Sequence, residues 1–120
     1  MRNFIERRRS IRANTDLIAA EVGAPYGFKY PVANLSRAGM YIYVSGSTCH
    51  IGRYVTLDVS IPGLPASVRV RGEVVRRNVN ERFDTAGIGL RFMDLHGESR
   101  DAIHGYVNRV VSGAEFEARA

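Results

Sequence analysis

Hydrophobic and polar residues alternate with a period of two through most of this chain. In the clearest segment, residues 39–44, Met40, Ile42 and Val44 share one face of an expected strand. Turn residues separate further segments of the same kind: 16–22, 27–35, 55–61, 68–74 and 88–92. Alternation of this kind is typical of antiparallel strands that bury one face. Pro31 lacks an N–H donor and indicates an edge or a bulge in its strand, and residues 78–85 are expected to form a polar loop.

The period changes after Leu95. Apolar residues then recur at the spacing of one helical face: Ile103, Tyr106, Val107, Val110 and Val111. Gly113 is the expected end of this helix. The pattern as a whole predicts a six-stranded antiparallel β-barrel with one C-terminal α-helix.

With 120 residues the chain has room for one domain, and 45% hydrophobic residues suffice for a core. We expect an N-terminal arm over residues 1–12, a barrel with its helix over 13–113, and a flexible tail over 114–120. No apolar run approaches the ~20 residues of a membrane span, and the polar start does not resemble a secretory signal. A cytoplasmic location is therefore expected.

Charge is concentrated in the arm. Its five arginines and one glutamate give residues 1–12 a charge of +4, out of +5 for the whole chain. Lys29 is the only lysine among seventeen basic residues. Guanidinium groups form planar, bidentate contacts with phosphates and base edges, so this bias points to an anionic partner. Taken alone, the arm is equally consistent with a solvated basic tail.

Motifs typical of catalysis are absent from the sequence. His50, His96 and His104 show no metal-ligand spacing, and a lone cysteine, Cys49, excludes an internal disulfide. No phosphate-binding loop or nucleophile motif is present. We therefore expect no enzyme, no catalytic residue, no metal and no resident cofactor.

The segment from Asn34 to Gly39, with the sequence Asn-Leu-Ser-Arg-Ala-Gly, lies where one expected strand ends and the next begins. Asn34 and Ser36 share a face and offer an amide and a hydroxyl to a purine edge, and Gly39 permits a turn or a close approach. The same residues also suit a plain turn.

Together, these features resemble the PilZ domain, a bacterial receptor for the second messenger cyclic di-GMP. That family has an Arg-x-x-x-Arg motif before its first strand, here Arg8 to Arg12, and an Asp/Asn-x-Ser-x-x-Gly motif, here Asn34 to Gly39. Later strands, at residues 70–76 and 87–92, continue the likeness, which spans residues 6–111.

The resemblance implies that cyclic di-GMP is clamped between the arm and the barrel surface. The implied ligand-binding residues are Arg7, Arg8, Arg12, Asn34, Ser36 and Gly39. Asn34 replaces the commoner Asp, which implies a weaker or differently placed contact. The arm would become ordered on binding, and the domain would then signal to a partner protein in trans.

Two other functions stay open. Small β-barrels also bind single-stranded nucleic acids, and Tyr41 and Tyr43 lie on one strand face with arginines further along. However, a nearly neutral body counts against such a partner, so we expect no nucleic acid. A PilZ-like adaptor that binds protein and ignores nucleotide is the other alternative.

Overall fold

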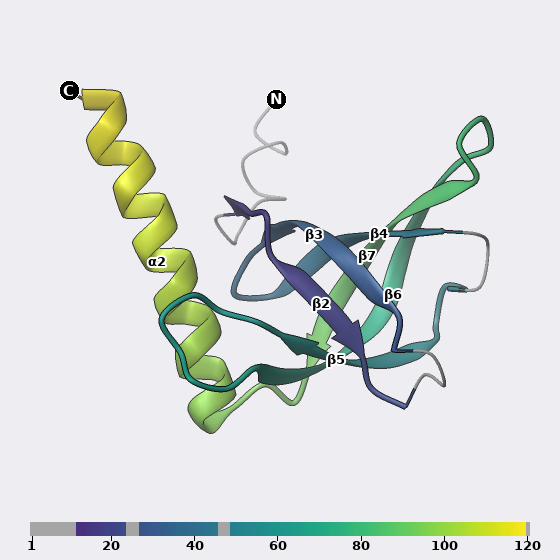
Figure 1. The fold of residues 1–120 in the computed structure, drawn as a ribbon, viewed down its shortest axis with the longest axis horizontal. Helices are drawn as coiled ribbons and strands as arrows, with labels where there is room; N and C mark the ends of the chain where they lie inside the picture. The colour runs from purple at the N-terminus through teal and green to yellow at the C-terminus, as the bar shows by residue number, and fades with distance from the viewer. Residues whose placement is uncertain (1–11, 24–26, 46–48, 120) are drawn as a thin grey trace, which may run out of the picture.

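The computed structural model describes residues 12–23, 27–45 and 49–119, with side chains up to residue 113. In chain order the elements are β1 (Ala13–Asn14), β2 (Ile18–Glu21), β3 (Lys29–Leu35), β4 (Gly39–Ser45), β5 (Tyr54–Val59), β6 (Val68–Asn80), β7 (Thr85–Met93) and α2 (Gly97–Arg119) (Figure 1). Each strand predicted from the alternation is present, and the bridge β1 was not foreseen.

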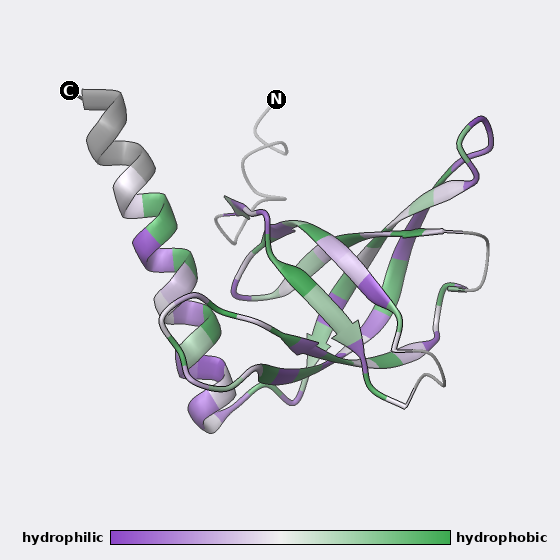
Figure 2. Cartoon of the chain, in the orientation of Figure 1, coloured by the Kyte–Doolittle hydropathy of each residue, from purple (hydrophilic) through white to green (hydrophobic). Residues whose placement is uncertain are grey.

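Six of the strands close into an antiparallel barrel. The neighbours run β3–β2–β5–β6–β7–β4, and β4 pairs back with β3, while β1 adds a short bridge to β3. Figure 2 shows apolar and polar residues alternating along the strands. The apolar set forms the core, in which Leu35, Ile42, Leu57 and Ile88 are fully buried. The predicted barrel is therefore confirmed, with a bulge at Ala33, two residues beyond Pro31.

Helix α2 packs along one side of the barrel and extends beyond it (Figure 1). Ile103, Tyr106 and Val107 from the predicted stripe join the same core cluster as the strand residues. The predicted end at Gly113 is wrong, because α2 continues to Arg119. One exposed glycine destabilises a helix by only about 1 kcal/mol, and most of the residues after it are strong helix formers.

The predicted polar loop over residues 78–85 is also wrong at both ends. Residues 78–80 belong to β6 and Thr85 begins β7, so a four-residue turn joins the two strands. Within this turn Asp84 adopts a positive φ of 51°. Pairing with β7 satisfies the backbone of β6 even where its side chains are exposed and polar. The resulting hairpin projects from the barrel on the side away from α2 (Figure 1).

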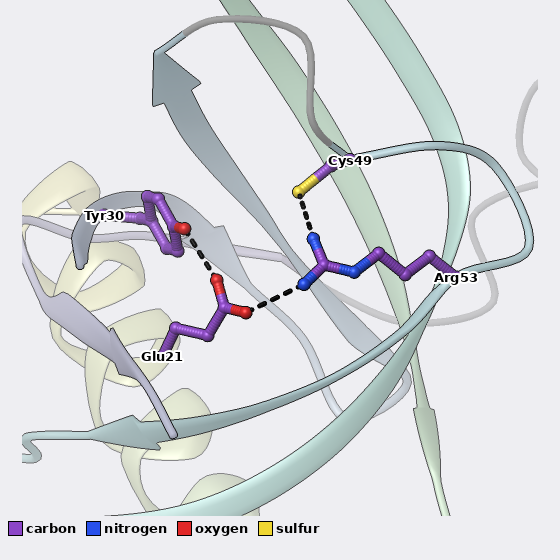
Figure 3. A network of polar contacts seen from close by, with 4 residues as sticks. All are labelled: Glu21, Tyr30, Cys49 and Arg53. Atoms are coloured by element: carbon purple, nitrogen blue, oxygen red, sulfur yellow. Dashed lines mark hydrogen bonds and ion pairs between the residues drawn. The ribbon is translucent and has the colours of Figure 1, made fainter. Parts of the chain in front are cut away.

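A polar network joins β2, β3 and the segment before β5 (Figure 3). The Tyr30 hydroxyl donates to Glu21 Oε1 at 2.7 Å, and Arg53 donates to Glu21 Oε2 at 2.9 Å. The second Arg53 terminal nitrogen lies 3.6 Å from the buried Cys49 Sγ. Burial, together with the hydrogen bond to Glu21, raises the pKa of Tyr30 well above its ordinary value. The network therefore favours the protonated phenol.

Candidate functional site

Ser36 shapes the turn between β3 and β4. Its Oγ accepts the backbone N–H groups of Ala38 and Gly39, each at 3.2 Å, and donates to the Gly39 carbonyl at 3.3 Å. The Ser36 backbone N–H also donates to that carbonyl, at 2.9 Å. A hydroxyl has one donor and two acceptor positions, so the turn uses all three. In this arrangement the Ser36 hydroxyl is engaged within its own turn, and its expected contact with a purine edge stays a prediction.

Gly39 lies where β4 packs against β7. A Cβ atom at this position would lie 1.9 Å from the Leu90 carbonyl oxygen and 3.0 Å from the Leu90 carbonyl carbon. Both neighbours are backbone atoms, which cannot rotate away. The missing side chain of Gly39 is therefore required by the close approach of the two strands.

Tyr41 crosses the outer face of β7. A Cβ on Gly87 would lie 2.0 Å from the Tyr41 hydroxyl oxygen, and a Cβ on Gly89 would lie 3.8 Å from Tyr41 Cδ1. The Tyr41 hydroxyl accepts a hydrogen bond from the Asn78 amide of β6 at 2.8 Å. Tyr43 meets the Tyr41 ring edge-on, with 5.8 Å between centroids, and is half exposed. Gly87 and Gly89 thus leave room for the Tyr41 ring on the surface of β7, and the hydrogen bond from Asn78 fixes its hydroxyl group.

A pocket of about 260 Å³ opens beside this tyrosine. We call it the turn pocket, because the turn between β3 and β4 contributes much of its wall. Its lining residues come from the end of the arm and from β3, β4, β6 and β7: Arg12, Asn34, Ser36, Ala38, Gly39, Met40, Tyr41, Val75, Arg76, Gly89, Leu90 and Arg91. Arg12 directly precedes β1, whose Asn14 pairs with Asn34, and this bridge brings Arg12 to the pocket.

The structure thus brings four of the six predicted ligand-binding residues to one pocket: Arg12, Asn34, Ser36 and Gly39. Arg7 and Arg8 lie outside the described residues. Within the part of the chain that is described, neither the Arg12 guanidinium nor the Asn34 amide has a hydrogen-bond or ion-pair partner. Both groups are therefore available to a ligand, whereas Ser36 and Gly39 shape the pocket.

Sequence reasoning missed the wall that β6 and β7 contribute. Arg76 and Arg91 both line the turn pocket, and Arg91 forms an ion pair with Glu73 at 2.5 Å. The adjacent Val74 and Val75 carried a usable signal, because two consecutive apolar residues interrupt the alternation of β6. Such an interruption is typical of a β-bulge.

A larger groove of about 600 Å³ lies between the segment before β6 and the start of α2. Its charged lining is mixed, with Arg69 and Arg109 against Glu98 and Asp101. Arg69 already forms a two-pronged ion pair with Asp58, and this contact lowers the pKa of Asp58. None of the motif residues that the structure describes lines this groove, so its volume alone does not make it the better candidate.

Other kinds of site receive no support from the described residues. Among them, no group of three or more His, Cys, Asp or Glu side chains is placed to hold a metal ion. No helix in this part of the chain is long and apolar enough to cross a membrane.

Comparisons with known proteins agree with this fold. The chain is similar to the structure of MotI/DgrA, the inhibitor of motility of Bacillus subtilis, with a TM-score of 0.75 and 15% identity over 89% of this chain and 52% of that one. It is similar to the PilZ domain of YcgR from Escherichia coli, solved with c-di-GMP (TM-score 0.66, 13% identity, 94% and 98% covered). It is also similar to the MrkH–c-di-GMP complex of K. pneumonia (TM-score 0.70, 12% identity, 92% and 55% covered).

This chain spans about half the length of the MotI and MrkH chains, and at these identities the likeness shows the fold alone. A search of curated protein sequences gives no significant match. A family model described as the PilZ domain matches residues 6–109, which include both motifs and most of α2. Because this match covers well over half of the chain, the protein belongs to the PilZ domain family.

Proposed function

We propose that this protein is a receptor for cyclic di-GMP and binds it at the turn pocket. The observation that carries the proposal is the meeting of Arg12 with Asn34, Ser36 and Gly39 around one cavity, although 21 residues separate Arg12 from Asn34. The solved YcgR and MrkH structures contain c-di-GMP on a similar fold, and this supports the same class of ligand.

The free groups of the pocket suit the chemistry of this ligand. The Arg12 guanidinium can bind a phosphate, or the O6 and N7 acceptors of guanine, through two parallel N–H donors. Asn34 offers an amide oxygen to guanine N–H groups and an amide N–H to an acceptor. The volume of the turn pocket, about 260 Å³, is smaller than the usual ~300–1,000 Å³ of a pocket that encloses a whole ligand. The turn pocket therefore takes one part of the dinucleotide, and the rest lies against the surface.

The arm completes the site in this proposal. Arg7 and Arg8 bind the exposed part of the ligand, and neutralisation of their mutual repulsion by two phosphates orders the arm over the barrel. The turn is connected to α2, because Arg37 donates to the Asn108 side chain at 3.0 Å. An ordered arm beside this turn forms a new surface that a partner protein recognises in trans. Hydrogen exchange tests this step, since protection of residues 5–12 must rise on addition of ligand, and unchanged protection contradicts it.

Titration calorimetry with the purified chain tests binding itself. Cyclic di-GMP must bind with saturation. GTP, which lacks the cyclic pair of phosphodiesters, and cyclic di-AMP, which lacks the guanines, must bind much more weakly. Loss of a charge-assisted bidentate partner weakens binding by about 2–4 kcal/mol, or roughly thirty-fold or more, so Arg8→Ala and Arg12→Ala must each show at least this loss. Arg100→Ala removes the same charge from the exposed start of α2 and must bind as the unsubstituted chain does.

Equal losses in all three variants would indicate diffuse charge attraction and would refute a specific site. Saturable binding of single-stranded oligonucleotides, with a steep dependence on salt, would instead support the nucleic-acid alternative.

A further inference from the structure

The turn pocket has a basic residue on β6 that belongs to neither motif. Arg76 lines the cavity, its side chain is exposed, and in the described part of the chain no hydrogen bond or ion pair reaches its guanidinium. The other arginine on this side, Arg91, differs because Glu73 neutralises it. Arg76 therefore places a positive charge at the pocket that no carboxylate among the described residues neutralises.

A β-bulge places Arg76 on this face. Val74 pairs with Leu90 and Arg76 pairs with Gly89, so Val75 is an extra residue in β6. In a regular ladder with no bulge, Val75 would pair with Gly89. Arg76 would then lie opposite Ile88, whose side chain is fully buried. A shift of one residue reverses the face of every later side chain. The bulge thus moves Arg76 from the core face to the pocket face.

The Arg76 and Tyr41 side chains both lie close to Gly89, which has no side chain to displace them. A Cβ on Gly89 would lie 3.1 Å from Arg76 Cβ and 3.8 Å from both Arg76 Nε and Tyr41 Cδ1. Gly89 therefore leaves a flat surface in the pocket wall, with the side chains of Tyr41 and Arg76 next to it. The hydrogen bond from Asn78 fixes Tyr41, so this part of the pocket wall is formed before any ligand arrives.

Arg12 and Arg76 reach the pocket from opposite sides of β4 and β7. Arg12 precedes β1, next to β3, whereas Arg76 belongs to β6, beyond β7. Two guanidinium groups around one cavity repel each other unless an anionic or acceptor-rich group lies between them. A cyclic dinucleotide presents such groups at several points, as two phosphates and two guanine edges.

We infer that Arg76 is a further ligand-binding residue of the turn pocket. Its guanidinium binds a phosphate or a guanine edge of the cyclic dinucleotide from the β6 side. The inference rests on the proposed function, because it concerns the same ligand. It adds a binding residue from a strand that carries neither motif, and it gives the bulge at Val75 a role in recognition.

Calorimetry with cyclic di-GMP on the full chain tests this assignment, with Arg76→Ala, Arg76→Lys and a matched control, Arg69→Ala. Arg69 also belongs to β6 and carries the same charge, but it pairs with Asp58 away from the pocket. Arg76→Ala must bind roughly tenfold more weakly or worse, as expected for loss of a charge-assisted contact. Arg69→Ala must stay within about threefold of the unsubstituted chain. Urea midpoints verify that each variant is folded.

The lysine variant and a second ligand identify the group that Arg76 binds. If Arg76 binds a guanine edge, Arg76→Lys loses the planar fork and binds cyclic di-GMP nearly as weakly as Arg76→Ala. If it binds a phosphate, Arg76→Lys recovers most of the affinity, and Arg76→Ala weakens residual cyclic di-AMP binding by the same factor.

Two negative outcomes are distinguishable. If the unsubstituted chain binds cyclic di-GMP, and Arg76→Ala and Arg69→Ala bind it equally strongly, this inference is overturned. The proposed function then stays intact. Absence of binding by the unsubstituted chain overturns both.

Discussion

Gly39→Ala tests whether the motif glycine is required by the barrel itself. The added methyl carbon would lie 1.9 Å from the Leu90 carbonyl oxygen, where ordinary contact begins near 3.4 Å. Relief requires β4 and β7 to separate by roughly 1.5 Å at this point. The separation strains the ladder between Gly39 and Arg91 and the adjacent bond from the Phe92 N–H to the Ala38 carbonyl, which is 2.8 Å long.

The expected destabilisation follows from these contacts. Overpacking a core typically lowers stability by about 1–3 kcal/mol when side chains can adjust. Here the neighbour is backbone, and a weakened ladder hydrogen bond contributes about 1 kcal/mol more. We therefore predict that Gly39→Ala lowers the free energy of unfolding by at least about 3 kcal/mol, which is a large fraction of the ~5–15 kcal/mol of a typical domain.

Urea denaturation followed by circular dichroism measures this effect. With a slope of about 1–3 kcal/mol per molar urea, the midpoint must fall by at least about 1 M. Gly113→Ala is the matched control, because Gly113 is exposed in α2 and its added Cβ would meet nothing within 4 Å. That variant must gain about 0.5–1 kcal/mol from helix propensity. A loss of less than about 1 kcal/mol in Gly39→Ala would refute the packing argument.

Three further predictions concern stability. Since folding raises the pKa of Tyr30 above its ordinary value of 10.0, its contribution is complete below about pH 10 and falls as pH rises above it. Tyr30→Phe must flatten this alkaline decline in unfolding free energies measured between about pH 9 and pH 11, and an unchanged slope contradicts the assignment. Ile88→Ala must lower stability by about 2–5 kcal/mol in urea, because the side chain is fully buried, and a change below about 1 kcal/mol would show that the core is misplaced. Gly87→Ala must displace the Tyr41 ring and weaken stability by about 1–3 kcal/mol, less than Gly39→Ala since a side chain can move, and a neutral result refutes the contact.

The elements of the fold could be predicted from the sequence because each strand of the barrel buries one face. In β4 and β5 the alternation of apolar and polar residues therefore follows the alternation of buried and more exposed side chains. The far end of β6, residues 78–80, escaped prediction, because its side chains are exposed and its two asparagines resemble a loop. Only pairing with β7 identifies these residues as part of a strand, and pairing partners are not visible in a local pattern.

The site was predictable in part for a related reason. The two motifs identify Arg12 and the turn residues as candidates. Whether each of their polar groups is free to bind a ligand depends on tertiary contacts. The Ser36 hydroxyl is used within its own turn, and Gly39 lies against a strand distant in sequence. Arg76 was placed only among the arginines of the nucleic-acid alternative and not at the turn, because a single bulged residue changes the face on which it lies.

A titration of the isotope-labelled chain with cyclic di-GMP, followed by amide NMR, tests the central claim most directly. The account predicts saturable shifts that cluster in the turn between β3 and β4 and around Gly89, with the arm arginines included. Absence of saturable shifts, or shifts confined to the larger groove between the start of α2 and the segment before β6, would contradict it.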